Sequence, residues 1–337
     1  MNLTLFLGAG FSAPFDHPVM DSFLGFTDSC ASLTDDDRAF LDRLVLEARR
    51  ANSFLESSPT NLEDILSFAE MGERLRLTEE AENRNNRLRV ILQKIYTTSP
   101  RARDYWLRYK ALKTLIGAEP RKFKGALSFV TTNYDLNIES ACISLNSQAN
   151  PGFELRRVEQ GNVHVVGTCY DASGIPLYKL HGSVNWYPTD DEPGLVVEDR
   201  VVAIYDLESS ENQLALPYPC ASDYKSPGIP VIVPPSFLKP DLPRALKAVW
   251  SGAAQVLSKA NVGAFVGYSF PPSDTEMMFF LARAFSDNAG LRAVYLVDPK
   301  AEAIVSRLRA PGSKIGSHFR DLLRPIESEW IGVSLPL

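Results

Sequence analysis

The sequence has few cysteines, and no two of them are close together. The four cysteines are Cys30, Cys142, Cys169 and Cys220, and no CxxC pair occurs. A structural zinc site built from such pairs is therefore not expected, and no other metal site is predicted. Buried free thiols in a reducing cytoplasm are the simplest interpretation of these residues.

Long hydrophobic runs and blocks of basic charge are also missing. No apolar stretch approaches the roughly 18 residues of a membrane span. The N-terminal MNLTLFLGAGFSAP has no basic leader, so it predicts a strand and not a signal peptide. With 35 basic and 41 acidic residues the net charge is −6, which gives no support for direct nucleic-acid binding. We expect a cytoplasmic protein that enters no membrane.

Short apolar runs alternate with helical patterns along most of the chain. Strands are predicted at 2–7, 126–130, 163–169, 176–181, 262–266 and 291–297, with a shorter one at 201–205. Helices are predicted at 136–145, 242–260 and 275–286, and from about residue 301. This alternation is typical of an α/β fold, here a Rossmann-like doubly wound parallel sheet.

Residues 35–116 have a different character. They are rich in Leu, Glu and Arg, and their apolar residues have helical spacing, which predicts about four helices and no strand. We interpret them as a smaller all-helical domain inserted into the Rossmann-like domain, which then comprises 1–34 and 117–337. Open sheets bind ligands beyond the carboxyl ends of their strands, and every unusual short motif falls at such an end.

The GAGFSA segment at residues 8–13 directly follows the first predicted strand and matches G-x-G-x-x-A. The first glycine permits a tight turn, the second lets the backbone approach a phosphate, and a helix start attracts negative charge. A plain strand-to-helix turn has the same pattern. A dehydrogenase requires a second strand with a terminal acidic residue about 20 residues later, and no such strand follows here. Hydride transfer is therefore disfavoured, whereas a dinucleotide-binding site is not.

Two further polar motifs follow predicted strands. TTNYD at 131–135 contains Asn133, whose carboxamide can hold a water or a ribose hydroxyl without adding charge. An uncharged group of this kind suits a site where positive charge develops on a sugar. LHGS at 180–183 contains His181, which can accept a proton. Each has an ordinary alternative, because Asn favours caps and turns and a lone histidine is more often structural.

The ends of two later strands also carry candidate ligand contacts. Gly267 and Ser269 follow one strand and are candidates for phosphate or ribose contacts, and Asp274 is a candidate cap of the next helix. Asp298 ends the strand after that. A carboxylate there can hold ribose hydroxyls, or it can cap the following helix before Pro299.

Taken in order, the motifs GAGFS, TTNYD, KLHGS, PPS…K, GYSFPPSD and VDP resemble the SIR2-like family. The resemblance covers about 1–20 and 126–300, includes NLED at 61–64, and is closer to bacterial SIR2 proteins of anti-phage defence than to protein deacylases. It implies a SIR2 domain that binds NAD⁺. The residues that it places against NAD⁺ are Gly8, Ala9, Gly10, Ser12, Thr132, Gly267, Ser269 and Asp298.

The resemblance also implies catalytic roles for three residues. Asn133 would align the nicotinamide ribose and an attacking water, Asp135 would support that pocket, and His181 would act as the base. The four-cysteine zinc module of sirtuin deacylases is missing, so no zinc is expected and water is the expected acceptor. The implied activity is an NAD⁺ glycohydrolase, with NAD⁺ as substrate and nicotinamide and ADP-ribose as products.

Relatives in anti-phage defence deplete NAD⁺, and an unregulated NADase would be toxic. We therefore expect activation by homo-oligomerisation or by a co-encoded partner, which in this family includes HerA-like ATPases, Argonaute-like proteins and separate sensor proteins. The exposed side of the helical block or the segment 187–240 is the expected interface. Two other functions stay open: an NAD⁺-dependent protein deacylase, and a non-catalytic NAD⁺- or ADP-ribose-binding subunit of a larger defence complex.

Overall fold

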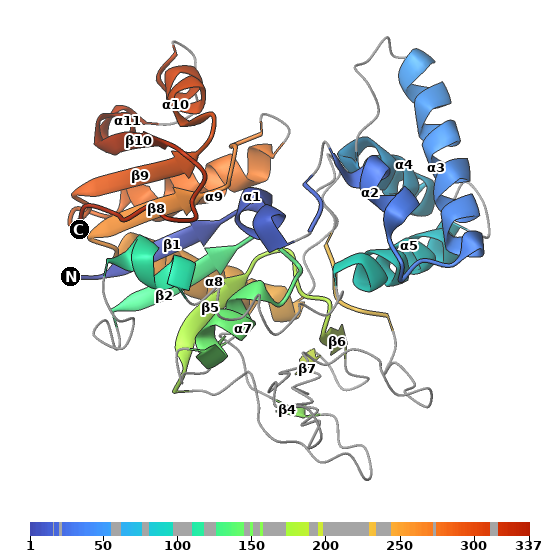
Figure 1. The fold of residues 1–337 in the computed structure, drawn as a ribbon, viewed down its shortest axis with the longest axis horizontal. Helices are drawn as coiled ribbons and strands as arrows, with labels where there is room; N and C mark the ends of the chain where they lie inside the picture. The colour runs from blue at the N-terminus through green and yellow to red at the C-terminus, as the bar shows by residue number, and fades with distance from the viewer. Residues whose placement is uncertain are drawn as a thin grey trace.

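The centre of the molecule is a seven-stranded parallel sheet with the strand order β10-β9-β8-β1-β2-β5-β3 (Figure 1). The computed structural model describes residues 1–15, 17–19, 22–54, 62–75, 81–96, 110–117, 126–144, 149–150, 156–157, 173–188, 195–197, 229–233, 244–271, 274–310 and 316–337. The strands of the sheet are β1 (Leu3–Leu7), β2 (Leu127–Thr131), β3 (Ala149–Asn150), β5 (Ile175–Lys179), β8 (Val262–Val266), β9 (Ala293–Asp298) and β10 (Leu323–Glu327).

The sheet is doubly wound about β1. From β1 the chain moves to β2 and β3 on one side, returns to β5 between these two strands, and later moves to β8, β9 and β10 on the other side. Because crossovers between parallel strands are right-handed, the two directions place their helices on opposite faces. The helices of the main crossovers are α7 (Asn137–Ser144), α8 (Arg244–Ser258), α9 (Thr275–Ser286) and α10 (Ala301–Arg309). The predicted fold class is confirmed, and α9 has the predicted bounds.

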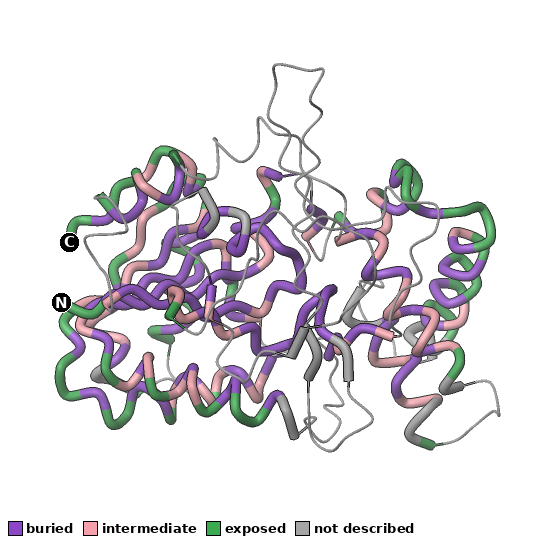
Figure 2. Tube along the Cα trace, turned by 90° about the horizontal axis from the view of Figure 1, so that it is seen from below, coloured by how far each residue is buried: buried purple, intermediate pink, exposed green. Residues whose placement is uncertain are grey.

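The three central strands are buried along their whole length, which explains why they read as apolar runs in the sequence. Figure 2 shows this buried centre with exposed helix faces outside it. In β1, Leu3 pairs with Leu127 of β2 and with Val262 of β8, so the three strands run in register. Their carboxyl ends, and the polar motifs that follow them, therefore meet at one edge of the sheet.

Four helices form what we call the helical group: α2 (Phe23–Ser29), α3 (Asp35–Phe54), α4 (Leu62–Arg74) and α5 (Ala81–Tyr96). The group lies beyond the carboxyl ends of the central strands (Figure 1). Its hydrophobic cluster also contains Tyr134, Leu136, Val184 and Ile232, which come from segments at the edge of the sheet. A further helix at 110–116 packs into the core of the sheet instead. The domain boundaries at 35 and 117 stay a prediction.

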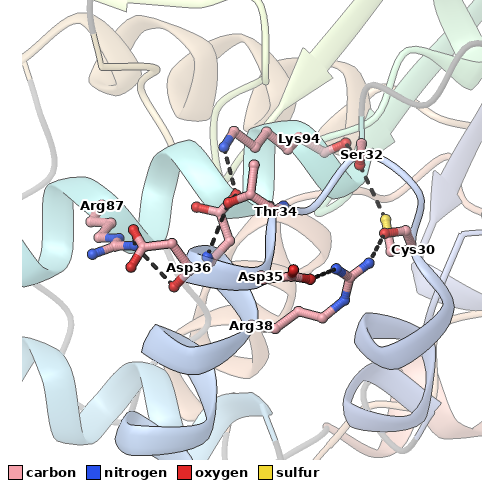
Figure 3. Close-up of polar contacts among 9 residues, drawn as sticks. Cys30, Ser32, Thr34, Asp35, Asp36, Arg38, Arg87 and Lys94 are labelled. Carbon is pink, nitrogen blue, oxygen red and sulfur yellow. Dashed lines mark hydrogen bonds and ion pairs between the residues drawn. The ribbon is translucent and has the colours of Figure 1, made fainter.

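A polar cluster fixes the start of α3 against α5 (Figure 3). Thr34 Oγ1 accepts a hydrogen bond from Asp37 N, and Asp37 Oδ2 accepts one from Thr34 N, both at 3.1 Å, which is a reciprocal helix cap. Lys94 Nζ lies 2.6 Å from Asp37 Oδ2. Burial by itself raises the pKa of Asp37, but hydrogen bonds from Lys94 and Thr34 and the Lys94 charge outweigh it and lower the pKa below 3.8.

The C-terminal residues contain two elements that sequence analysis missed, α11 (Ser317–Leu322) and the edge strand β10. Strand β10 has the sequence LRPIE, in which only Leu323 is fully buried, so no apolar run marks it. A proline such as Pro325 is tolerated there because an edge strand leaves one side unpaired. Farther on, the Trp330 ring stacks on Phe11 at 4.5 Å and its Nε1 donates to Phe11 O at 3.1 Å.

Three short strands form a second sheet of order β4-β7-β6: β4 (Arg156–Arg157), β6 (Trp186–Pro188) and β7 (Leu195–Val197). The predicted strands at 163–169 and 201–205, Asn61 and the PPS…K motif at 234–239 lie outside the described residues. Within the described ranges, no helix has the length and apolar character that crossing a membrane requires.

Candidate functional site

Two glycine-containing loops pack backbone to backbone at the ends of β1 and β8. Gly8 N donates to Val266 O at 3.0 Å, and Gly10 N donates to Gly267 O at 2.9 Å. A β-carbon on Gly10 would lie 2.8 Å from the Cα of Gly267, and one on Gly267 would lie 2.3 Å from Phe11 N. Gly267 also has φ +62°, which favours glycine. The predicted GAGFSA turn is thus held by the predicted Gly267 loop.

The segment after Gly8 is a single helical turn. Helix α1 covers only Ala9–Ser12 and continues as a 3-10 turn at Ala13–Phe15. Ala9 and Gly10 are partly exposed, whereas Ser12 is buried. The loop therefore presents a small, side-chain-poor backbone surface at the edge of the sheet, while Ser12 points into the protein.

The side chain of Asn133 is oriented by two hydrogen bonds. Its Nδ2 donates to Gly8 O at 2.8 Å and to Ser12 Oγ at 3.1 Å. Both amide hydrogens are thereby engaged inside the protein, so the group that Asn133 can offer a ligand is its amide oxygen, an acceptor. Thr131 Oγ1 accepts from Asn133 N at 3.0 Å, and Thr132 N donates to Leu7 O. The TTNYD loop is thus tied to the end of β1.

A chain of buried polar groups continues from Ser12. Ser12 Oγ donates to Asp135 Oδ2 at 2.7 Å, and Asp135 Oδ1 accepts from Asn137 N at 2.9 Å. The Asn137 Nδ2 lies 2.9 Å from His17 Nδ1. Three of the predicted site residues, Ser12, Asn133 and Asp135, are therefore joined directly. Asn137 was not predicted, because an asparagine at a helix start carries no distinctive signal.

His181 lies on a loop that is clamped to a distant segment. It follows β5, is 2% exposed, and its carbonyl accepts from Val233 N at 2.8 Å. Gly182 has φ +81°, and a β-carbon there would lie 1.9 Å from Val231 O. The Tyr134 ring lies 6.4 Å from the imidazole, centroid to centroid. This close packing fixes the direction of the His181 backbone.

A buried ion pair that the sequence did not reveal lies between the Asn133 and His181 loops. Lys179 Nζ and Glu139 Oε1 are 2.9 Å apart, and both side chains are 0% exposed. The ammonium also donates to Ser183 Oγ at 2.7 Å and to the carbonyls of Tyr134 and Asp135. Two charged residues 40 positions apart look like surface residues in a sequence, so only the fold brings them together.

The remaining predicted contacts line the ends of β8 and β9. Asp274 caps α9 as predicted, accepting from Met277 N at 3.4 Å and from the Tyr268 hydroxyl at 3.0 Å. Ser269 is exposed, and its carbonyl accepts from Arg307. Asp298 Oδ1 accepts from the backbone nitrogen of residue 300 at 2.8 Å, so this carboxylate shapes the turn after β9.

Helix α5 of the helical group contacts both motif loops. Gln93 Nε2 donates to Val184 O at 2.7 Å, three residues after His181. The Tyr96 ring lies 5.8 Å from the ring of Tyr134, in an edge-to-face arrangement. Burial raises the pKa of the Tyr96 hydroxyl, and the negative charge of Asp135 raises it further. Tyr96 therefore stays neutral beside the site.

No group of three or more His, Cys, Asp or Glu side chains that could hold a metal is found in the part of the chain that the structure describes. Cys30 and Cys142 are buried free thiols, while Cys169 and Cys220 lie outside that part. Burial raises the pKa of the Cys142 thiol, and the negative charge of Glu139 raises it further. This thiol is held in its protonated, unreactive form.

The fold and this edge define a Rossmann-like α/β protein whose polar side chains gather at the carboxyl ends of β1, β2, β5, β8 and β9. A family model described as SIR2-like domain matches residues 127–315, which is more than half of the chain. The chain therefore belongs to the SIR2-like domain family, as the motifs predicted. A comparison with curated proteins gives no significant match.

Solved structures with similarity to the chain include Sir2Tm bound to a propionylated peptide, with 14% identity, coverage of 98% of this chain and 89% of the other, and a TM-score of 0.35. A Sir2 bound to an acetylated peptide has 13% identity, the same coverages and a TM-score of 0.37. A Sir2 homologue in complex with NAD has 13% identity, coverages of 88% and 78%, and a TM-score of 0.35.

Proposed function

We propose that this protein is an NAD⁺ glycohydrolase that cleaves the bond between nicotinamide and ribose. The observation that carries the proposal is the fixed amide of Asn133, whose two hydrogens are held by Gly8 O and Ser12 Oγ. Its oxygen is then an uncharged acceptor for a ribose hydroxyl or a water. Such an acceptor suits a reaction in which positive charge develops on the sugar, as in glycoside hydrolysis.

In the proposed reaction, the electron pair of the glycosidic bond leaves with neutral nicotinamide, and a water oxygen bonds to the same ribose carbon. One proton of that water is released, with His181 as the base that accepts it from the water or a ribose hydroxyl. The products are nicotinamide and ADP-ribose, and no oxidation or reduction occurs. The exposed backbone around Gly10, Gly267 and Ser269 would accept the phosphates and the adenosine half, with Thr132 and Asp298 beside them.

We also propose that the protein acts in anti-phage defence by depleting NAD⁺, and that a partner or self-association activates it. The contacts of α5 support this regulation, because Gln93 and Tyr96 connect the helical group to the loops of His181 and Asn133. A protein bound to the outer side of the helical group would thereby reach the site without covering it. A HerA-like ATPase, an Argonaute-like protein, a sensor protein or a second copy of the chain are the partners to test.

The decisive experiment measures nicotinamide release from NAD⁺, with chromatographic identification of the products, alone and with the co-encoded proteins. We expect release by wild type, and a loss of at least about 100-fold in Asn133→Ala and in His181→Ala. Asn83→Ala, an exposed asparagine of α5, is the matched control and should keep full activity. Binding of NAD⁺ without release in any assembly would refute the proposal and identify a binding subunit, whereas acyl transfer from an acyl-lysine peptide would identify a deacylase.

A further inference from the structure

The side chain of Lys179 is one of the most buried in the molecule, yet it carries a charge. It is the last residue of β5, is 0% exposed, and its ammonium has four acceptors. These acceptors are Glu139 Oε1 at 2.9 Å, Ser183 Oγ at 2.7 Å, Tyr134 O at 3.2 Å and Asp135 O. An ammonium has only three hydrogens, so its hydrogen-bonding capacity is fully used within the protein.

Three of the four acceptors come from the two loops of the proposed site, and the fourth, Glu139, lies in the first turn of α7. Tyr134 and Asp135 directly follow Asn133, and Ser183 is two residues after His181. The two loops are also bonded directly, because Val184 N and Ser183 Oγ donate to Tyr134 O at 3.1 and 3.3 Å. The ammonium therefore lies at the junction of the loops, and its bonds set the distance between their backbones.

A purely structural role would not require a charge at this position. Replacing a buried ion pair with apolar side chains of similar volume is often neutral or stabilising, because two charges no longer have to be desolvated. An ammonium differs from an apolar group in that its bonds have direction. The three N–H groups are shared among Glu139, Ser183 and the carbonyls of Tyr134 and Asp135. They hold the two loops in one geometry, and packing alone does not specify that geometry so closely.

We infer that Lys179 and its counter-ion Glu139 are a positioning pair for the cleavage of NAD⁺, which fixes Asn133 relative to His181. This inference rests on the proposed function, because it assigns a reaction to those two residues. Neither Lys179 nor Glu139 touches the substrate. They act through the loops that they join, and a displacement of about 1 Å in such a constellation can lower a rate about 100-fold.

The test is the double variant Lys179→Met/Glu139→Leu, which removes both charges and keeps most of the volume. We expect it to remain folded, with some loss of stability because the Asp135 carbonyl loses its donor, while kcat for NAD⁺ falls about 100-fold and KM changes less than about threefold. Lys247→Met, a substitution of an exposed lysine on α8, is the matched control and should keep wild-type kcat. A folded double variant with wild-type kcat would overturn the inference and leave the pair a structural role only.

Ser183→Ala provides a test with little risk to folding, because it deletes one hydroxyl and leaves the ion pair in place. If the double variant does not fold, this variant decides: a kcat about tenfold below wild type supports the inference, and an unchanged kcat overturns it. If wild type releases no nicotinamide, the proposed function fails separately, and ADP-ribose affinity measured by calorimetry takes the place of kcat. An affinity at least tenfold weaker in the variant would then support the positioning pair, and an unchanged affinity would reject it.

Discussion

The packing of Gly267 against the GAGFSA loop leads to a prediction that can be worked out in numbers. In Gly267→Ala, the new β-carbon would lie 2.3 Å from Phe11 N and 2.4 Å from the carbonyl carbon of Gly10, both of which are backbone atoms. The residue would also keep φ +62°, which costs an alanine about 1–2 kcal/mol. Relief of the overlap adds about 1–3 kcal/mol, so we expect the free energy of unfolding to fall by about 2–5 kcal/mol.

Gly263→Ala is the matched control, because Gly263 lies in β8, the strand that directly precedes Gly267. The atoms nearest to a β-carbon there would be side-chain atoms of Phe285 and Val294 at 3.8 to 4.0 Å, which is ordinary contact. Its unfolding free energy should change by less than about 1 kcal/mol. Urea unfolding followed by circular dichroism measures both, and calorimetry with NAD⁺ should show weaker binding for Gly267→Ala alone. Equal stability of the two variants would refute the reasoning about backbone contact.

Two further predictions concern the helical group. Gln93→Leu leaves the buried Val184 carbonyl without its donor, so thermal unfolding should show a loss of stability of about 1–3 kcal/mol. The control Gln255→Leu, on the exposed face of α8, should change stability by less than about 0.5 kcal/mol. Similar losses in both variants would contradict this role of Gln93. The pKa of Asp37 is lowered in the folded protein, so its bond to Lys94 stabilises the fold above about pH 4 and stops doing so as the pH falls through the folded pKa. The stability difference between wild type and Asp37→Asn should therefore be present at pH 7 and shrink in acid-unfolding curves as the pH falls below about 4. A difference that grows with acid would reverse the assigned sign.

The strands and motifs could be predicted because each leaves a local signal in the sequence. A strand buried on both faces must be apolar throughout, as in β1 and β8, and the polar residues that end such strands meet at one edge of a parallel sheet. That rule places Asn133, Asp135 and Ser12 near one another, and the structure joins them by direct hydrogen bonds. The same rule places Gly267 beside Gly10.

What could not be predicted depends on contacts between residues far apart in the chain. Lys179 and Glu139 are ordinary surface residue types, and nothing in either local segment marks them as buried. Strand β10 escaped because an edge strand is only half buried and shows no apolar run. The contact of Gln93 with Val184 joins a helix to a loop 91 positions away, which no periodic pattern reveals.

The buried charges also explain how an uncharged acceptor can be kept at the proposed site. The carboxylate of Asp135 receives the Ser12 hydroxyl on one oxygen and Asn137 N on the other, so its negative charge is compensated inside the protein. The Ser12 hydroxyl donates its hydrogen to Asp135, so its oxygen accepts a hydrogen bond from Asn133 Nδ2. This bond turns the amide hydrogens of Asn133 toward the inside of the protein. The carboxylate therefore determines the orientation of Asn133 through Ser12, while both of its own oxygens are engaged inside the protein. If Asp135 faced the sugar, its charge would favour capture of the ribosyl cation by the protein, whereas an amide oxygen leaves that carbon open to water.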